Sequence, residues 1–258
     1  MLGTIIGDIV GSRFEFNNTS DFDFELFTSE CDYTDDSICT VAVADAILNN
    51  RSYQEAMLAW CRKYPYPMGS YGMSFKRWIH SAHPVPYNSF GNGSAMRVSA
   101  VGWLFDTEEE VLEQAKQSAE ITHNHPEGIK GAQAAALAIY LCRKGMSKEA
   151  MLKHMHAYYP TFTEPRLGAN PFIETCQGTL PICFGIIEKA TNFEEALRYA
   201  IAVGGDSDTI GAIVGGMAES IWGVPAPIKA KAMEYLPTDI KDIYTQFVMR
   251  TANKQDRI

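Results

Sequence analysis

The sequence of 258 residues lacks the features expected of a membrane-embedded or secreted protein. No apolar run reaches the about 20 residues that a membrane-spanning helix needs. The N-terminal run MLGTIIGDIVG has no basic segment before it and contains Asp8, which a signal peptide would not. Six cysteines occur without a CxxC pair or zinc-ligand spacing, so free, buried thiols are expected. These absences predict a cytoplasmic protein.

Positive charge is also scarce, since the formal net charge is -9. Such a balance argues against a surface that follows nucleic acid or an anionic membrane, and neither is expected as a partner. No Pro-, Ser- or Gly-rich tract divides the chain, and apolar residues, at 46%, suffice for one large core. We therefore expect a single compact domain that spans residues 1–258.

Sustained strand alternation is missing, whereas helical periodicity and helix-end signals recur. Ser52 and Thr107 each begin a capping-box pattern, Pro126 suits a first helical turn, Gly145 suits a helix end, and Ser147 suits a helix start. The chain is predicted to be all-α. Helices are expected after residue 36 and over 52–62, 95–105, 107–121, 126–145, 147–159, 175–189, 193–203, 209–222, 226–235 and 238–252.

One stretch of small residues near each end of the chain resembles the other. Residues 7–15 read GDIVGSRFE and residues 211–219 read GAIVGGMAE, with Gly, Ile-Val-Gly and Glu at equal offsets. Glycine costs about 1 kcal/mol at each helix-interior position relative to alanine, so several together need a reason. Close helix–helix approach at the centre of the fold is the reason we favour, and we place the two stretches side by side.

Two short acidic motifs precede small apolar helical segments: TDDS at 34–37 and DSDT at 206–209. For either motif alone, helix capping by its side-chain oxygens is the simpler explanation. Together they supply four aspartates, which would repel one another strongly without a cation between them. Oxygen donors without His or Cys are typical of Mg²⁺, Mn²⁺ or Ca²⁺ sites and not of Zn²⁺ sites. The four aspartates with Thr34 and Thr209 could ligate two ions.

These motifs and their order resemble the ADP-ribosylglycohydrolase family over nearly the whole chain. The resemblance runs through GDIVGSRFE, TDDS, GNGSAMR, ITHNHPEGIKGA and GGDSDTIGAIVGGMAE. It implies an all-helical fold around a binuclear Mg²⁺ or Mn²⁺ centre. It also implies hydrolysis of the N- or O-glycosidic bond between ADP-ribose and a protein side chain or small molecule, with ADP-ribose as product.

The resemblance also assigns roles to individual residues. The implied metal ligands are Thr34, Asp35, Asp36, Asp206, Asp208 and Thr209. Glu15 matches the acidic residue that gates the metal site in eukaryotic relatives. The general base would be Glu15 or an aspartate such as Asp35 or Asp208, and the sequence does not choose among them.

The segment NSFGNGS at 88–94 precedes a predicted helix, and a glycine-rich turn at a helix start can approach an anion closely. An ordinary loop and cap is the alternative. In the family context Ser89, Gly91 and Asn92 are assigned to the diphosphate of ADP-ribose, Gly93 to the same ligand-binding turn, and Phe90 to stacking on adenine or to the core.

A second turn, which contains His123 and His125, belongs to the same predicted ligand site. His123 and His125 lack the third ligand of a zinc site, and the resemblance places His123 beside the diphosphate as a hydrogen-bond donor or, alternatively, as a structural turn residue. The aromatic loop 64–72 is a candidate ribose or adenine wall. No aspartate occurs between 45 and 106, where some arginine-specific relatives carry one, so the acceptor stays open.

Two other functions remain compatible with the motifs. A two-metal nucleotide phosphohydrolase would release phosphate or AMP in place of ADP-ribose. A non-catalytic ADP-ribose-binding or crystallin-like protein would bind without turnover, although such a role would not require all the metal-motif oxygens and Glu15.

Overall fold

The computed structural model describes residues 1–255, and the all-α prediction is confirmed for them. Two isolated bridges, Thr34 with Met68 and Gly91 with Thr175, are the β-pairings within this range. The helices are α1 (Leu2–Gly11), the 3-10 helix η1 (Ser12–Phe14), α2 (Asp35–Leu48), α3 (Tyr53–Lys63), α4 (Met73–His80), α5 (Gly93–Met96), α6 (Ser99–Leu104), α7 (Glu108–Glu120), α8 (Pro126–Arg143), α9 (Lys148–Met155), α10 (Cys176–Lys189), α11 (Phe193–Ala202), α12 (Ser207–Trp222), α13 (Ala226–Ala232) and α14 (Thr238–Gln255).

Four helices begin at the residues that the start signals indicate. Thr107 and Glu110 form a reciprocal capping box at α7, and Pro126 is the first residue of α8. Ser52 caps α3 and Ser147 caps α9 by accepting a backbone N–H of the first turn. Local sequence therefore determines where these helices start.

Three segments differ from the prediction. The expected helix over 95–105 is divided at Arg97 and Val98 into α5 and α6, and at this break the buried Arg97 guanidinium donates to the Ser118 carbonyl of α7. Helix α9 ends at Met155 and not near 159, where Pro160 disfavours helical backbone in the residue before it. Helix α4 was not predicted, although Phe75, Trp78 and Ile79 form a buried helical stripe.

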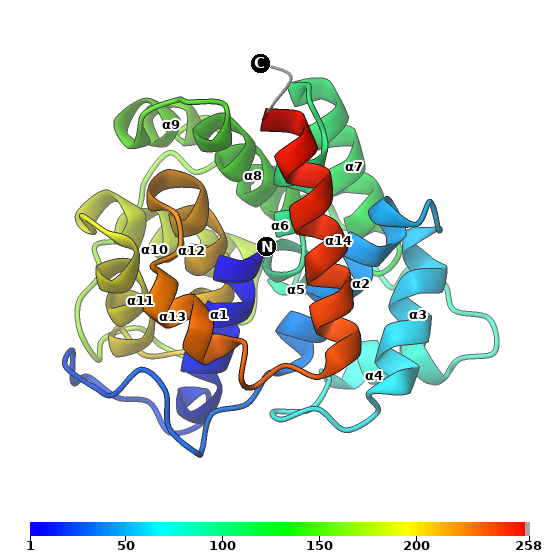
Figure 1. Ribbon diagram of the computed structural model, residues 1–258, viewed down its shortest axis with the longest axis horizontal. Coiled ribbons are helices and arrows are strands. Elements are labelled where there is room, and N and C mark those ends of the chain that lie inside the picture. The colour runs from blue at the N-terminus through cyan, green and yellow to red at the C-terminus, as the bar shows by residue number, and fades with distance from the viewer. Residues whose placement is uncertain (256–258) are drawn as a thin grey trace.

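Helices α1 and α12 pack against each other at the centre of the molecule (Figure 1). A Cβ added to Gly7 would overlap the Gly211 carbonyl, and one added to Gly3 would overlap the Gly215 carbonyl. The two backbones are therefore in direct contact, as the matching small-residue stretches led us to expect. At the C-terminal end of α1, a Cβ on Gly11 would lie 2.6 Å from the Cα of Asp208. The crossing thus brings the N-terminal helix to the second acidic motif.

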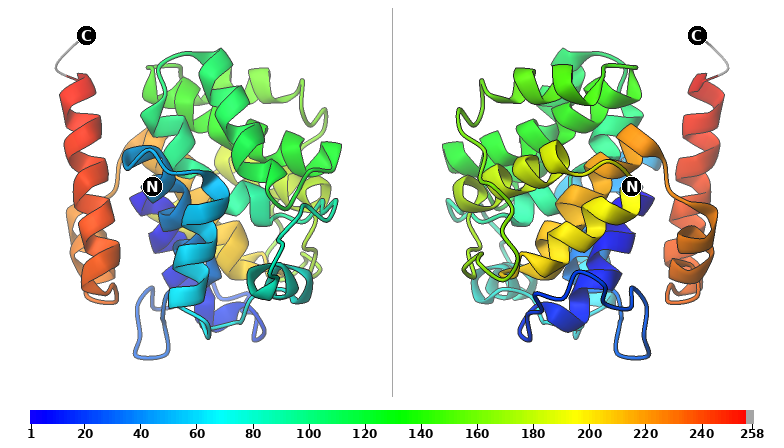
Figure 2. Two further views of the ribbon diagram at one scale, coloured as in Figure 1. Left: turned by 90° about the vertical axis from the view of Figure 1, so that its right-hand side faces the viewer. Right: turned by 90° about the vertical axis from the view of Figure 1, so that its left-hand side faces the viewer.

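The other helices surround this central pair. Helices α2, α8, α10 and α11 pack on α1 or α12, while α14 lies along α2 at the edge of the body, as the side views of Figure 2 show. The buried apolar side chains form one continuous core. All six cysteines are buried and free, as expected. None of the helices in the described range is long and apolar enough to cross a membrane.

Gly7→Ala is expected to destabilise the protein by about 1–3 kcal/mol or more, because the α1–α12 contact leaves no room for a methyl group. The free energy of unfolding from urea titration measures the effect. Gly72→Ala is the matched control, since a Cβ there has no atom within 4 Å. Equal stability of the two variants would contradict the close packing.

Candidate functional site

The first acidic motif begins α2. Thr34 is the N-cap, and its hydroxyl accepts a hydrogen bond from the backbone N–H of Asp36 at 3.2 Å. The threonine therefore caps the helix, and neither carboxylate of the motif is needed for capping. Asp36 is buried, and its Oδ1 has no hydrogen-bond partner among the described residues. Asp35 lines the adjoining cavity.

Asp8 of α1 holds this motif in place, a role that the sequence analysis missed. Its fully buried carboxylate accepts hydrogen bonds from the Thr34 backbone N–H at 2.9 Å and the Thr34 hydroxyl at 2.7 Å. It also accepts from the Ser37 backbone N–H at 3.0 Å and from the Ser37 hydroxyl. An aspartate inside the apolar run of α1 was the signal that could have revealed it, because a buried charge needs partners.

The second acidic motif begins α12 after a turn in which Gly204 and Gly205 have φ of 83° and 86°. Asp206 is the N-cap residue but makes no side-chain cap hydrogen bond. Its Oδ2 instead accepts a hydrogen bond from the Asn92 amide at 2.7 Å. Thr209 donates from its hydroxyl to Asp36 at 3.3 Å, so the two motifs are in direct contact.

Glu15 lies at the end of η1, next to both motifs. Asn18 connects this segment to the glycine turn: its amide donates to the Phe14 and Gly205 carbonyls, and its Oδ1 accepts from the Gly205 backbone N–H at 2.8 Å. On the other side, a Cβ on Gly69 would overlap Oε2 of Glu15, so the 64–72 loop packs directly on the carboxylate. That Oε2 is buried without a hydrogen-bond partner within residues 1–255.

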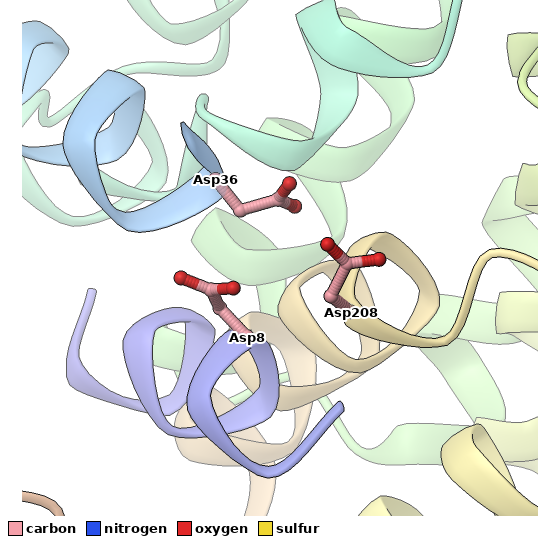
Figure 3. A group of neighbouring side chains, drawn as sticks. All are labelled: Asp8, Asp36 and Asp208. Carbon is pink, nitrogen blue, oxygen red and sulfur yellow. The ribbon is translucent and has the colours of Figure 1, made fainter. Parts of the chain in front are cut away.

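The carboxylates converge from separate elements. Oxygens of Asp8, Asp36 and Asp208 lie within 4.8 Å of one another, and so do oxygens of Glu15, Asp206 and Asp208. Figure 3 shows the first group, with side chains from α1, α2 and α12 directed into one shared space. Asp208 belongs to both groups and therefore joins them.

This crowding has an electrostatic cost. Burial, and then the charges of Asp36 and Asp206, raise the pKa of Asp208 well above its usual value. Burial, followed by the charges of Asp206 and Asp8, raises the pKa of Glu15 to about 7. Burial raises the pKa of Asp8 to about 6, although its four hydrogen bonds oppose that shift. Clustered acids with unpartnered oxygens and only oxygen donors fit hard divalent cations.

The loop at 88–94 forms the far side of the same region. Ser89, Phe90, Gly91 and Gly93 line the cavity with His123, as the sequence predicts for a common site. The helix that begins within this loop, α5 (Gly93–Met96), has only four residues, and the predicted helix over 95–105 is therefore not continuous. The Asn92 amide lines the cavity too, but it donates to Asp206 and Thr179 and thus supports the second acidic motif.

A cavity of about 700 Å³ joins the acidic cluster to this loop. Of the aromatic loop, residues 69–72 line it, whereas Tyr64 donates its hydroxyl to Asp239 of α14. The lining also includes residues that were not predicted, among them Phe16, Phe172 and Glu174. The Phe16 and Phe172 rings stack 6.0 Å apart at its edge. The cavity therefore has an acidic end with aromatic neighbours and a glycine-rich end with His123.

A family model described as ADP-ribosylglycohydrolase matches residues 1–257. The chain belongs to the ADP-ribosylglycohydrolase family. A solved structure titled "ADP-ribosylglycohydrolase-related protein complex" has the same fold, with a TM-score of 0.76 at 20% identity over 97% of this chain and 95% of that chain.

Two relatives of this family cover most of the chain. Human ADP-ribosylhydrolase ARH3 is 23% identical over 325 residues, covering 93% of this chain and 90% of the human protein. The ADP-ribosyl-[dinitrogen reductase] glycohydrolase of Rhodospirillum rubrum is 25% identical over 255 residues, covering 86% and 84%. The match to mouse ADP-ribosylhydrolase ARH3, 28% identical, covers 60% of this chain and 52% of the mouse protein, so it spans about half of that relative. These relatives are hydrolytic enzymes by name, and the family assignment inferred from the motifs is confirmed.

Proposed function

We propose that this family member is a divalent-cation-dependent hydrolase that cleaves the glycosidic bond between ADP-ribose and an acceptor. The observation that carries the proposal is the single cavity of about 700 Å³, which holds both acidic motifs at one end and the 88–94 loop with His123 at the other. Such a volume is in the range that binds a drug-sized ligand. ADP-ribose has a matching polarity, with ribose hydroxyls at one end and a diphosphate further along.

Two cations are proposed at the acidic end. Their ligands would come from Thr34, Asp35, Asp36, Asp206, Asp208 and Thr209. Support comes from the unpartnered, buried Oδ1 atoms of Asp36 and Asp208 and from the contact between Asp36 and Thr209. Bound Mg²⁺ or Mn²⁺ would neutralise these carboxylates and polarise ribose or water oxygens. Asp8 would keep the first motif in register through its hydrogen bonds to Thr34 and Ser37.

The rest of the ligand would extend toward the loop. The diphosphate would lie at the Ser89–Gly93 turn near His123, and adenine beside the Phe90 ring, which is 42% exposed and therefore accessible for stacking. This placement would put C1 of the distal ribose near Glu15. In the metal-free protein the pKa of Glu15 is raised to about 7, and its carboxylate beside the metal ligands is placed to act as a general acid or base. Asp35 and Asp208 remain alternative bases.

Product analysis tests the proposal. The protein, with Mg²⁺ or Mn²⁺, would be incubated with defined conjugates of ADP-ribose to arginine, serine, a nucleobase and a small-molecule acceptor. Release of intact ADP-ribose from at least one conjugate is expected. Phosphate or AMP as the product would indicate a nucleotide phosphohydrolase, and ADP-ribose binding without turnover would indicate a binding protein.

Gly91→Val is expected to weaken ADP-ribose binding by about tenfold or more, which corresponds to 1.4 kcal/mol. A Cβ at this position already meets the Glu174 carbonyl and the Ser89 hydroxyl at 3.3 Å, so valine would push the turn into the ligand space. Calorimetry with ADP-ribose in saturating Mg²⁺ measures the change. Gly145→Val is strained because Gly145 has a φ of 91°, but it lies after α8 and does not line the cavity, so it controls for a loss of stability alone. Equal ADP-ribose affinity in both variants would contradict the placement.

An ADP-ribosylated protein or small molecule is the proposed substrate. The cytoplasmic location stays a prediction from the sequence.

A further inference from the structure

Arg97, a buried cation with no carboxylate partner among residues 1–255, lines the cavity together with His123. Arg97 is 1% exposed, and its Nη2 donates to the Ser118 carbonyl and to the Thr122 hydroxyl, both at 2.9 Å. Its Nε has no hydrogen-bond partner among residues 1–255. Arginine has only donors and stays protonated in proteins, so both contacts are donations from the guanidinium. The Thr122 oxygen must therefore act as an acceptor toward Arg97.

The direction of the next hydrogen bond follows from this one. The Thr122 hydroxyl lies 2.7 Å from Nδ1 of His123. Among residues 1–255, this hydroxyl oxygen contacts Arg97 and His123. A hydroxyl that accepts from Arg97 still has one proton to donate. Nδ1 is the acceptor in reach. An acceptor Nδ1 carries no proton, so the single proton of a neutral imidazole lies on Nε2.

Two further features keep the imidazole neutral. Burial, and then the positive charge of Arg97, lower the pKa of His123 well below its usual value. The other titratable neighbour is Tyr87, whose ring packs 6.1 Å from the imidazole and whose pKa burial raises to about 12, so it is uncharged at pH 7. A neutral His123 can donate one hydrogen bond into the cavity, and only from the nitrogen that bears the proton.

That nitrogen faces the glycine turn. A Cβ built on Gly93 would lie 3.1 Å from Nε2, and one built on Gly91 would lie 3.4 Å from it. Within the described residues, Nε2 has no recorded hydrogen-bond acceptor, and His123 lines the cavity. The carbonyl of Thr122 also accepts from the Ser89 backbone N–H at 3.4 Å, which ties the turn to the same residue.

We propose that Arg97 and Thr122 are positioning residues that hold His123 as the Nε2–H tautomer, with this N–H directed at an anionic group bound at the Gly91–Gly93 turn. The identity of that anion as the diphosphate of ADP-ribose rests on the proposed function, whereas the tautomer does not. Without the relay, Nδ1 and Nε2 would compete for the proton. A His123 protonated on Nδ1 would present a lone pair to the phosphate oxygens and would repel them.

The tautomer is read by ¹H–¹⁵N correlation spectra of ¹⁵N-histidine-labelled protein at pH 7, with the His123 signals assigned by their loss in His123→Asn. Wild type is expected to show a protonated Nε2 and an unprotonated Nδ1. Thr122→Val keeps the branched shape and removes the hydroxyl, so the spectrum should change to a tautomer mixture or to Nδ1–H. Thr122→Ser should restore the wild-type pattern.

Binding measured in parallel extends the test to the anion. Thr122→Val is expected to bind ADP-ribose about tenfold more weakly, the loss of roughly one hydrogen bond to a charged group, with adenosine affinity unchanged. Ser118→Ala is the matched control: it removes a buried hydroxyl of α7 that donates to Ala115 and leaves the Ser118 carbonyl for Arg97, so tautomer and affinity should both stay as in wild type.

The outcomes separate the two ideas. An Nδ1-protonated His123 in wild type, or an unchanged spectrum in Thr122→Val, would overturn the relay whatever the protein binds. The expected spectra together with no ADP-ribose binding by wild type would leave the relay standing and would refute the proposed function.

Discussion

Glu15→Gln is expected to slow single-turnover release of ADP-ribose by about 10²–10⁴-fold, the usual effect of losing a general acid or base. The carboxylate lies within 4.8 Å of oxygens of Asp206 and Asp208, and its Oε2 is buried without a partner. Glutamine has nearly the same shape, so the fold and most of the ADP-ribose affinity should persist. The loss corresponds to about 3–5 kcal/mol of transition-state stabilisation.

The measurement is release of ADP-ribose from a cleavable conjugate with enzyme in excess, alongside calorimetric binding of the product. Glu174→Gln is the matched comparison, because its charge also raises the pKa of Glu15 while its backbone carbonyl, not its carboxylate, accepts from Asn92. A loss of less than tenfold is expected there. Equal turnover by wild type and Glu15→Gln would leave Glu15 without a catalytic role.

Much of the fold could be predicted because its signals are local. Helix starts at Ser52, Thr107 and Ser147 are encoded by oxygens that cap the first turn, and the structure has helices at those points. The break at Arg97 could not be predicted in this way. At the break Arg97 contacts Ser118 on another helix, and periodicity within residues 95–105 does not contain that information.

The site shows the same division. The acidic motifs are visible in the sequence because aspartates concentrate at two helix starts. Asp8, Asn18 and Arg97 are single polar residues, and each has a hydrogen-bond partner 25 to 187 residues distant in the chain. Only tertiary structure brings such partners together. Asp8 was the most accessible of them, since a lone aspartate in an apolar helix already requires an explanation.

The glycine crossing connects the fold to the site. Because the α1 and α12 backbones touch, Asp8 and Asp208 can both reach the oxygens of Asp36. A wider helix separation would move the carboxylates apart and relieve their repulsion, but it would also dissolve the cluster. The glycines of α1 and α12 therefore serve the arrangement of the carboxylates as much as they serve packing.

Mg²⁺ or Mn²⁺ is expected to stabilise the protein strongly near pH 8 and much less near pH 4.5. Folded-state pKa values above the unfolded ones mean that the unfolded chain loses these protons first as pH rises. Well below about pH 4 the acids are protonated in both the folded and the unfolded state, so they do not lower the stability. From there to about pH 7, the pKa reached by Glu15, the metal-free protein should lose stability as repulsion develops. Bound cations would remove that repulsion, so their effect should grow over the same interval.

At metal concentrations of about 100 times the dissociation constant, mass action contributes about 2.7 kcal/mol, or roughly 5–10 °C in melting temperature for a chain of this size. Thermal melts at pH 4.5, 6 and 8, with EDTA and with excess metal, measure it.

Asp208→Asn removes the carboxylate shared by both groups, so it should raise the metal-free melting temperature at pH 8 and abolish most of the metal response. Asp45→Asn is the control, because this buried aspartate pairs with Arg51 and Trp60 outside the cluster and its loss should leave the metal response intact. A melting temperature that is the same in EDTA and in excess metal at pH 8 would refute the proposed metal centre, whereas a metal response that survives in Asp208→Asn would move the ions away from this carboxylate.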